Sequence, residues 1–212
     1  MSRATALAPI REALGRAQPV LIFLAGPNGS GKSTFFYDYL GDLGLPYVNP
    51  DLFAAKRREA APDASSEEVE RRAFTEAEEM RDALLEAGIS FCTETVFSDP
   101  YRAKVGFLER ARASGYAVFL VFIGLDSVDL SVARVSHRVA TGGHDVPDEK
   151  LRARFPRTHA NLRAAIPVAD EVFLLDNSSF QQPYRLIAVY SQGQLISQNP
   201  PLPPWMQGLP GS

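Results

Sequence analysis

A glycine-rich segment, Gly26–Thr34 (GPNGSGKST), constrains the fold of this chain more than any other feature. The apolar run 20–25 precedes it, and residues 35–40 after it have a helix-forming pattern. A strand, a G-x-x-x-x-G-K-S segment and a helix, in this order, form the phosphate-binding loop of nucleoside triphosphatases and kinases. The sequence therefore predicts that the chain binds a nucleoside triphosphate.

Each residue type in this loop has a physical task. Glycines allow successive backbone N–H groups to turn inward around a polyphosphate, and the start of a helix adds a favourable dipole. Lys32 is expected to reach the terminal phosphates, and the Ser33 hydroxyl is expected to be a ligand of Mg²⁺. The predicted nucleotide-binding residues are Gly26, Pro27, Asn28, Gly29, Ser30, Gly31, Lys32, Ser33 and Thr34.

Composition narrows the class of protein. The 212 residues are 45% hydrophobic and 22% charged, as in an ordinary globular domain. A net charge of -3 argues against a general nucleic-acid or membrane-surface binder. The single cysteine, Cys92, excludes an internal disulfide and fits a reducing compartment. No apolar run approaches the roughly 20 residues of a membrane span, so we expect a soluble, cytoplasmic protein without a membrane or nucleic-acid partner.

Apolar segments alternate with amphipathic ones along most of the chain. Besides 20–25, strands are predicted at 45–49, 90–95, 116–123 and 171–175. Helices are predicted at 4–16, 52–60, 65–87, 101–114, 128–141 and 147–165. Strands alternating with helices predict an α/β fold, here a P-loop NTPase-like, doubly wound, mostly parallel five-stranded sheet with flanking helices.

The helix predicted at 65–87 has the clearest boundaries. Ser65 or Ser66 is its expected N-cap, and Gly88 ends it. Its predicted apolar stripe is Val69, Ala73, Phe74, Ala77, Met80 and Leu84.

The pattern changes after residue 180. Residues 185–198 predict a β-hairpin, which could extend the sheet or form a partner-binding surface, and 200–212 are proline-rich and expected to be loosely ordered. We expect residues 1–180 to form a P-loop domain with an N-terminal helix and a lid-like segment at 128–165. Residues 181–212 would add the C-terminal β-hairpin and tail to the same domain.

Acidic residues follow four of the predicted strands. Ligands of open parallel sheets bind at the carboxyl ends of the strands, and these ends carry Asp51, Glu94, Asp126 and Asp176. Each acid also has a structural alternative. Asp51 and Asp126 could cap helices, and Asp176 could fix a turn.

Asp51 is the candidate general base. The strand before it follows the phosphate-loop helix, which brings Asp51 near the γ-phosphate, where phosphoryl transfer to a hydroxyl requires a proton acceptor. Glu94, followed by Thr95 and Ser98, suits hydrogen bonding to a polyhydroxylic substrate or a water-mediated Mg²⁺ contact. A structural ion pair is the alternative for Glu94.

Two arginine-bearing helices supply cations. Arg134 and Arg138 share one helix face, and Arg154 and Arg157 share another with Thr158. A Gly142-Gly143 turn between these helices is typical of a mobile lid whose guanidinium groups neutralise charge on a γ-phosphoryl group.

Three residues near this segment receive a simpler interpretation. Arg152 and Arg163 are expected to be ordinary surface residues, and His144 is expected to order its loop through a hydrogen bond. Three histidines and one cysteine provide no metal-binding cluster that could recruit it.

In combination, these motifs resemble the zeta-toxin family, and more closely its compact bacterial branch of predicted ATPases. The similarity covers about residues 20–178. It is carried by GPNGSGKST, Asn49-Pro50-Asp51, Thr93-Glu94-Thr95, the R-V-x-x-R-V run 134–139, the G-G-H-D-V-P run 142–147, Arg154 and Asp176-Asn177-Ser178.

The resemblance implies an ATP- and Mg²⁺-dependent kinase that phosphorylates the amino-sugar 3′-hydroxyl of UDP-N-acetylglucosamine, possibly beside an antitoxin. Catalytic roles are implied for Asp51, Lys32, Arg138 and Arg154, with Asp51 as base and the two arginines as γ-phosphate clamps. Substrate contacts are implied for Glu94, beside Thr95 and Asp51, and a metal contact for Ser33. The chain is shorter than the long toxins and differs from them in the lid segment.

Other functions remain as alternatives. A kinase of another nucleotide-like molecule would use the same parts, and a nucleotide-binding ATPase or regulatory module without small-molecule phosphorylation would share the loop. The sequence lacks the guanine-specific N-K-x-D motif and the transporter signature L-S-G-G-Q. Nucleic-acid phosphorylation is disfavoured because the chain is acidic and has no long basic-aromatic groove.

Overall fold

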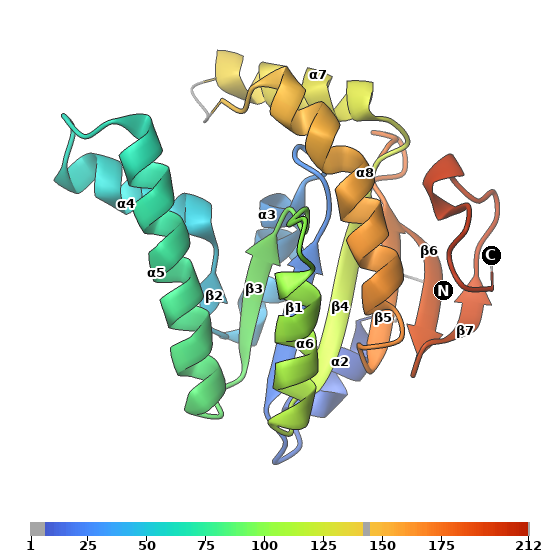
Figure 1. The fold of residues 1–212 in the computed structure, drawn as a ribbon. Coiled ribbons are helices and arrows are strands. Elements are labelled where there is room, and N and C mark those ends of the chain that lie inside the picture. The colour runs from blue at the N-terminus through green and yellow to red at the C-terminus, as the bar shows by residue number, and fades with distance from the viewer. Residues whose placement is uncertain (1–6, 142–144, 212) are drawn as a thin grey trace.

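The computed structural model describes residues 7–141 and 145–211 and contains one mixed sheet. Its strands lie in the order β2-β3-β1-β4-β5-β6-β7. The first five are parallel, namely β1 (Val20–Ala25), β2 (Tyr47–Val48), β3 (Phe91–Thr95), β4 (Ala117–Gly124) and β5 (Glu171–Asp176). The predicted α/β class with a mostly parallel sheet is confirmed (Figure 1).

The C-terminal hairpin continues this sheet. Strand β6 (Arg185–Ser191) pairs antiparallel with β5, and β7 (Gln194–Gln198) pairs antiparallel with β6. Of the two sequence-based alternatives for this hairpin, extension of the sheet is therefore the one observed. The described sheet has seven strands rather than five with a separate hairpin.

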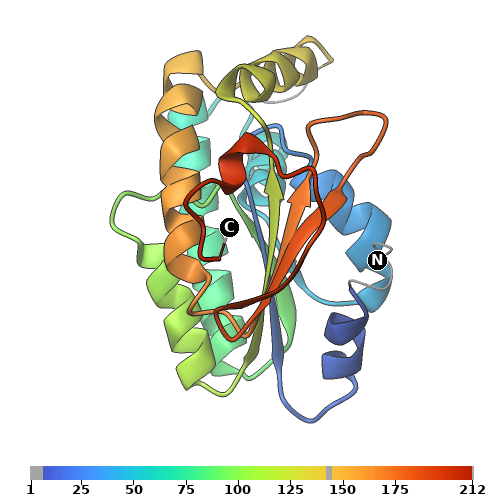
Figure 2. The same ribbon diagram turned by 90° about the vertical axis from the view of Figure 1, so that its right-hand side faces the viewer.

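Helices cover both faces of the sheet because its central strands are buried on both sides. All of β1 is buried, and alternate residues face opposite layers. One layer holds α2 (Ala8–Leu14), α3 (Lys32–Phe35), the π-helical turn η1 (Phe36–Leu40) and the 3₁₀ turn η2 (Gly41–Leu43). The other holds α5 (Ser66–Glu86), α6 (Ala103–Ala113) and α8 (Asp148–Ala165) (Figure 2).

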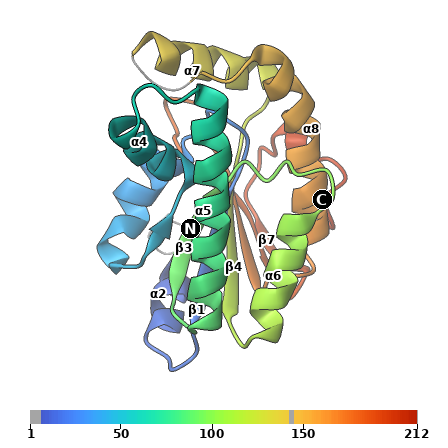
Figure 3. The same ribbon diagram turned by 60° about the vertical axis from the view of Figure 1, so that its left-hand side comes forward.

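Two helices lie toward the carboxyl ends of the parallel strands. Helix α4 (Pro50–Ala60) packs on α5, and α7 (Val128–Ala140) crosses above the strand ends before the chain enters α8 (Figure 3). Residues 142–144, which include the predicted glycine hinge and His144, lie outside the described residues, as do 1–6 of the predicted N-terminal helix. No helix in the described part of the chain combines the length and apolar character needed to cross a bilayer.

The helix caps correct two sequence-based alternatives. Asn49, not Asp51, caps α4, because its side chain accepts a hydrogen bond from the Asp51 amide. Ser127, not Asp126, caps α7 through the Leu130 amide. Ser65 caps α5, as predicted. Neither aspartate is therefore used as a helix cap.

The apolar stripe of α5 is only partly as predicted. Val69, Ala73, Ala77 and Leu84 are buried. Phe74 and Met80 are instead 48% and 44% exposed. The buried face of the helix includes the cation Arg81, which a pattern of apolar residues cannot reveal.

The prediction of a loosely ordered tail is wrong for its described part. Residues after β7 fold back onto the α8 face of the sheet, and Trp205, Met206 and Leu209 are buried in that core layer (Figure 2, red). Gly124 makes room for the indole, since a Cβ there would lie 2.4 Å from the Trp205 ring. Tail and sheet are complementary in shape.

Trp205→Ala should therefore lower the free energy of unfolding by about 3 kcal/mol, because it leaves a large cavity in the core. Chemical denaturation followed by circular dichroism measures this value. Leu202→Ala is the matched control, because Leu202 is 39% exposed and in the same tail. Equal, small losses for both variants would contradict the packing role of Trp205.

Candidate active site

A cavity of about 1220 Å³ opens at the carboxyl ends of the parallel strands. It is bordered by the phosphate loop, the end of β3, and parts of α4, α5, α7 and α8. Its volume exceeds the roughly 300–1,000 Å³ of a typical ligand pocket. The cavity therefore has room for more than one small molecule.

The phosphate loop takes a shape that requires glycine. Gly26 has φ of 149°, and a Cβ there would lie 2.2 Å from the Ile123 carbonyl oxygen. Gly31 has φ of 89°, and a Cβ there would lie 2.7 Å from the Tyr184 hydroxyl oxygen. Both positions combine positive φ with close approach of other atoms, so no other residue fits without distortion.

Three elements hold the loop in place. The Ser131 hydroxyl of α7 donates to the Asn28 carbonyl at 2.7 Å. The Asn177 amide group, just after β5, donates to the Ser30 carbonyl at 2.8 Å, and the Tyr184 hydroxyl donates to the Gly31 carbonyl at 2.9 Å. These contacts use loop carbonyls, and the Ser30 amide donates within the loop to the Pro27 carbonyl at 3.3 Å. Asn177 belongs to the Asp176-Asn177-Ser178 motif, but the bracing roles of Ser131, Asn177 and Tyr184 could not be predicted from the sequence.

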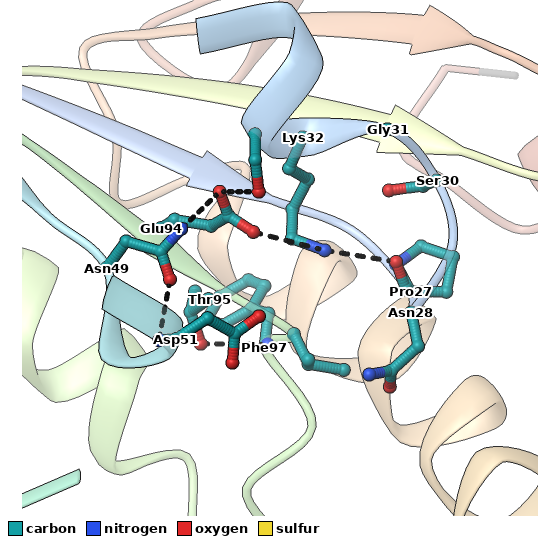
Figure 4. A network of polar contacts seen from close by, with 12 residues as sticks. Pro27, Asn28, Ser30, Gly31, Lys32, Asn49, Asp51, Glu94, Thr95 and Phe97 are labelled. Carbon is teal, nitrogen blue, oxygen red and sulfur yellow. Dashed lines mark hydrogen bonds and ion pairs between the residues drawn. The ribbon is translucent and has the colours of Figure 1, made fainter. Parts of the chain in front are cut away.

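Lys32 lies under this loop and is buried. Its Nζ donates to the Pro27 carbonyl at 3.1 Å and is 3.9 Å from Glu94 Oε1 (Figure 4). Burial lowers the pKa of Lys32, whereas the charges of Glu94 and Asp51 partly oppose that shift. Burial of the charged ammonium group therefore costs free energy, as expected for a group whose role is to bind a polyphosphate.

Glu94 is the centre of a polar network at the end of β3. Its Oε2 accepts hydrogen bonds from Ser33 Oγ at 2.9 Å, from Asn49 Nδ2 at 3.2 Å and from the Tyr47 hydroxyl. Burial, followed by the charge of Glu94, raises the pKa of Tyr47, so Tyr47 remains a donor. Sequence analysis identified Glu94 and Ser33 but missed Tyr47 and Asn49.

Tyr47→Phe should destabilise the protein by about 1–2 kcal/mol, because a partly buried carboxylate loses a hydrogen-bond donor. The same variant keeps the ring that stacks on Phe36. Urea denaturation gives the change in unfolding free energy, and Tyr37→Phe is the control, since Tyr37 is 60% exposed. A Tyr47→Phe protein as stable as the control would exclude the network as a stabilising feature.

Asp51 lies in the first turn of α4 and lines the same cavity. Its side chain is exposed, and Figure 4 shows the carboxylate directed toward the side where Lys32 and Asn28 lie. Burial lowers the pKa values of Lys32 and Arg154, and the charge of Asp51 opposes that shift at both cations. The backbone amide, not the carboxylate, serves the helix cap, so the carboxylate is available for chemistry.

The other two acids at this edge have structural surroundings. Asp176 is buried, and its Oδ1 accepts hydrogen bonds from Ser178 Oγ at 2.7 Å and Trp205 Nε1 at 3.3 Å. Burial raises the pKa of Asp126, whose backbone amide donates to Ser178 Oγ. Neither residue lines the cavity. The structure thus brings together Asp51 and Glu94 and separates Asp126 and Asp176 from them.

The predicted arginines border the cavity from two helices. Arg134 Nη1 donates to the Gly29 carbonyl at 3.4 Å, and Arg138 is close enough to Lys32 to lower its pKa. From α8, Arg154 and Arg157 line the opposite wall, and Arg157 Nε donates to the Ser98 carbonyl at 3.0 Å. Cations from α7 and α8 therefore face one space.

Residues near these arginines have mainly structural contacts. Thr158 is buried and donates to the Val96 carbonyl at 2.9 Å, while Thr95 Oγ1 accepts from the Phe97 amide at 3.0 Å. Arg152 forms a surface ion pair with Asp129 at 2.8 Å. Arg163 is exposed, as expected, and its Nε also donates to the Gly208 carbonyl at 2.7 Å in the tail.

The chain has an α/β fold of the P-loop NTPase type, with its phosphate loop at the edge of this cavity. The family model for zeta toxins matches residues 5–182, so the chain belongs to the zeta toxin family. An uncharacterised protein of Haemophilus influenzae is 26% identical over 146 residues, which cover 69% of this chain and 99% of that protein.

Solved structures share the fold at low sequence identity. A chain of the AvrRxo1-ORF1:AvrRxo1-ORF2 complex has a TM-score of 0.69 and 20% identity, and the match covers 92% of this chain and 66% of that one. A candidate kinase from Chloroflexus aurantiacus has a TM-score of 0.59 and 21% identity, with 79% and 90% covered. A chain of the PezAT toxin–antitoxin system of Streptococcus pneumoniae has a TM-score of 0.52 and 18% identity, with 81% and 75% covered.

Proposed function

We propose that this protein is an ATP- and Mg²⁺-dependent kinase that phosphorylates a hydroxyl group of a UDP-sugar such as UDP-N-acetylglucosamine. The observation that carries the proposal is the meeting of Asp51, Lys32 and the Ser33–Glu94 pair in one cavity beside the phosphate loop. Membership of the zeta toxin family supports the acceptor class. Both reactants and the single buried Cys92 fit the cytoplasm.

In this mechanism Asp51 accepts the proton of the acceptor hydroxyl. The acceptor oxygen forms a bond to the γ-phosphorus while the bond from that phosphorus to the bridging oxygen breaks, and ADP leaves. Lys32 and the loop N–H groups hold the phosphates, and Arg138 and Arg154 are placed to neutralise charge on the transferred group. No covalent enzyme intermediate is needed.

The residues present fit a nucleotide and Mg²⁺. Ser30 Oγ and Asn28 Oδ1 are buried in the loop without a hydrogen-bond partner among the described residues, as expected where a ligand supplies one. Ser33 and Glu94 provide adjacent oxygen atoms, the donor type that Mg²⁺ prefers. Bound Mg²⁺ would neutralise phosphate charge. Within the described chain no cluster of three or more His, Cys, Asp or Glu could hold a metal, so phosphate oxygens would complete the site.

The contacts of Glu94 bear on its two proposed roles. Its Oε2 accepts hydrogen bonds from Ser33, Tyr47 and Asn49, and its Oε1 faces Lys32. These contacts favour a role beside the phosphates and Mg²⁺ over direct binding of the acceptor sugar. Direct contact of Glu94 and Thr95 with the acceptor remains a prediction.

The experiment is incubation with ATP, Mg²⁺ and separate acceptors, followed by mass spectrometry. UDP-sugars, NAD and oligonucleotides form the panel, and we expect a UDP-sugar to gain one phosphate. Hydrolysis of ATP without any phosphorylated acceptor would favour the ATPase or regulatory alternative. Phosphorylation of NAD alone would keep the kinase and replace the acceptor.

We further propose that an antitoxin protein binds this chain. The support is the family and the fold shared with a chain of the PezAT toxin–antitoxin system. Co-expression with the product of an adjacent small gene, followed by affinity purification, tests this association. Purification of the chain alone, together with normal growth of cells that express it, would contradict it.

A further inference from the structure

Part of the cavity is lined by residues that, apart from Arg154, the transfer mechanism does not use. Its walls there come from α5, the start of α6 and α8. Four cations and one aromatic ring line it, namely Arg81, Lys104, Arg154, Arg157 and Phe74, together with the acids Glu67, Glu70 and Asp99. A cavity wall of this composition is suited to an anion.

Lys104 is the least compensated of these cations. Its Nζ lies 5.0 Å from the centre of the Phe74 ring, and no carboxylate in the described part of the chain lies within ion-pair distance of it. The carboxylate of Asp99 is nearby but already accepts hydrogen bonds from the Ala103 amide and Asn161 Nδ2. The ammonium group therefore faces the cavity without a counter-ion.

The neighbours of Lys104 make the lack of an anion costly. Burial, together with the charges of Arg81 and Arg154, lowers the pKa of Lys104 to about 8, and the charge of Asp99 opposes this shift. Arg81 does not compensate the charge of Lys104, because it is itself a cation and is paired with Glu78. Lys104 is half-buried beside other cations, which is unfavourable unless an anionic ligand binds there.

Arg154 connects this region to the proposed base. It interacts electrostatically with both Asp51 and Lys104, and all three residues line the cavity. A molecule whose hydroxyl reaches Asp51 can therefore extend within the same cavity toward Lys104. A negative charge on that remaining part would supply the counter-ion that Lys104 lacks.

On the basis of the proposed function, we propose that Lys104 binds a phosphate group of the acceptor, so that the enzyme selects phosphorylated acceptors over uncharged ones. The second phosphate site is separate from the phosphate loop and lies between α5, α6 and α8. Lys104 is a specificity residue here, because it touches the acceptor away from the reacting atoms. Lys104 belongs neither to the phosphate loop that binds the nucleotide nor to the residues that transfer the proton.

Binding measured without turnover tests the proposal. The nucleotide site is first saturated with a non-hydrolysable ATP analogue and Mg²⁺, and UDP or uridine is then titrated by calorimetry. Wild-type protein should bind UDP at least 10-fold more tightly than uridine, and Lys104→Met should lose most of that difference. Lys56→Met is the matched control, because Lys56 is exposed on α4 and outside the cavity.

Affinity for the ATP analogue should be the same in all three proteins. UDP binding by Lys104→Met equal to wild type would overturn the proposal, as would wild-type protein that does not distinguish UDP from uridine. Because this readout needs no phosphoryl transfer, it can succeed or fail independently of the kinase assignment.

Thermal stability separates a ligand-binding role from a structural one. The pKa of Lys104 is lower in the folded protein than its unfolded value of 10.5, so the folded state disfavours the charged form at pH 7. Lys104→Met should therefore raise Tm at pH 7 while it weakens UDP binding. A fall in Tm, repeated by Lys104→Gln, with unchanged UDP affinity would assign Lys104 a structural role instead.

Discussion

Asp51→Asn should reduce phosphoryl transfer about 1,000-fold and leave nucleotide binding intact. General base catalysis typically contributes about 10²–10⁴-fold, and the amide cannot accept the hydroxyl proton. The substitution preserves the size of the side chain and the backbone amide that donates to Asn49, so α4 keeps its cap. The loss should therefore appear in kcat rather than in stability.

Three measurements define this result. Product formation is followed by mass spectrometry, affinity for the ATP analogue by calorimetry, and folding by the unfolding midpoint. Asp63→Asn is the matched control, because Asp63 is exposed and does not line the cavity. If Asp51→Asn turned over within a few-fold of wild type, another group would have to accept the proton, and the placement of Asp51 would have misled us.

A pH profile adds a second check on the base. Asp51 lines the same cavity as Lys32 and Arg154. The residual rate of Asp51→Asn should rise with hydroxide concentration, since the solvent then replaces the missing base.

Much of the site could be predicted because parallel strands end at a common edge. That rule placed the phosphate loop, Asp51 and Glu94 together from their order in the sequence alone. It could not separate these acids from Asp126 and Asp176, whose strands end at the same edge. The distinction depends on side-chain partners, here Ser178 and Trp205 for Asp176.

What the sequence could not reveal are contacts between distant segments. Tyr47 and Asn49 meet Glu94 only because β2 pairs with β3, and two residues of strand carry too weak a pattern to fix that neighbour. The tail was mispredicted for a similar reason. Its proline content obscured Trp205, whose burial depends on the space left by Gly124 on a central strand.

Helix α5 shows the same limit on one element. The spacing of apolar residues along the helix predicted that Phe74 and Met80 are buried. In the structure Phe74 lines the cavity, and Arg81 is buried. Arg81 is paired with Glu78, so its burial depends on a charge partner rather than on hydrophobicity. Phe74 and Arg81 lie beside the cavity, where departures from the packing pattern are expected, whereas Met80 is exposed outside it.

Lys32→Met should weaken binding of the ATP analogue by at least 100-fold while the protein stays folded. Hydrogen bonds between charged groups contribute about 1.5–3 kcal/mol each, and Lys32 is the cation nearest to the predicted phosphate position. Methionine has a similar length, so the buried volume is retained. Calorimetric titration with the analogue and Mg²⁺ measures the loss, and Lys56→Met provides the control on an exposed helix face.

The same substitution should raise the stability of the nucleotide-free protein. Burial holds the pKa of Lys32 below its unfolded value of 10.5, so the unfolded chain binds more protons and stability rises with pH up to that value. Removing the ammonium group relieves this cost at neutral pH, and Glu94 keeps its donors Ser33, Tyr47 and Asn49. A Lys32→Met protein with higher Tm and no nucleotide affinity would show that the fold keeps a destabilising charge for its ligand. Lower Tm together with near-normal affinity would mean that Lys32 acts in packing, and the phosphate-loop assignment would lose its main cation.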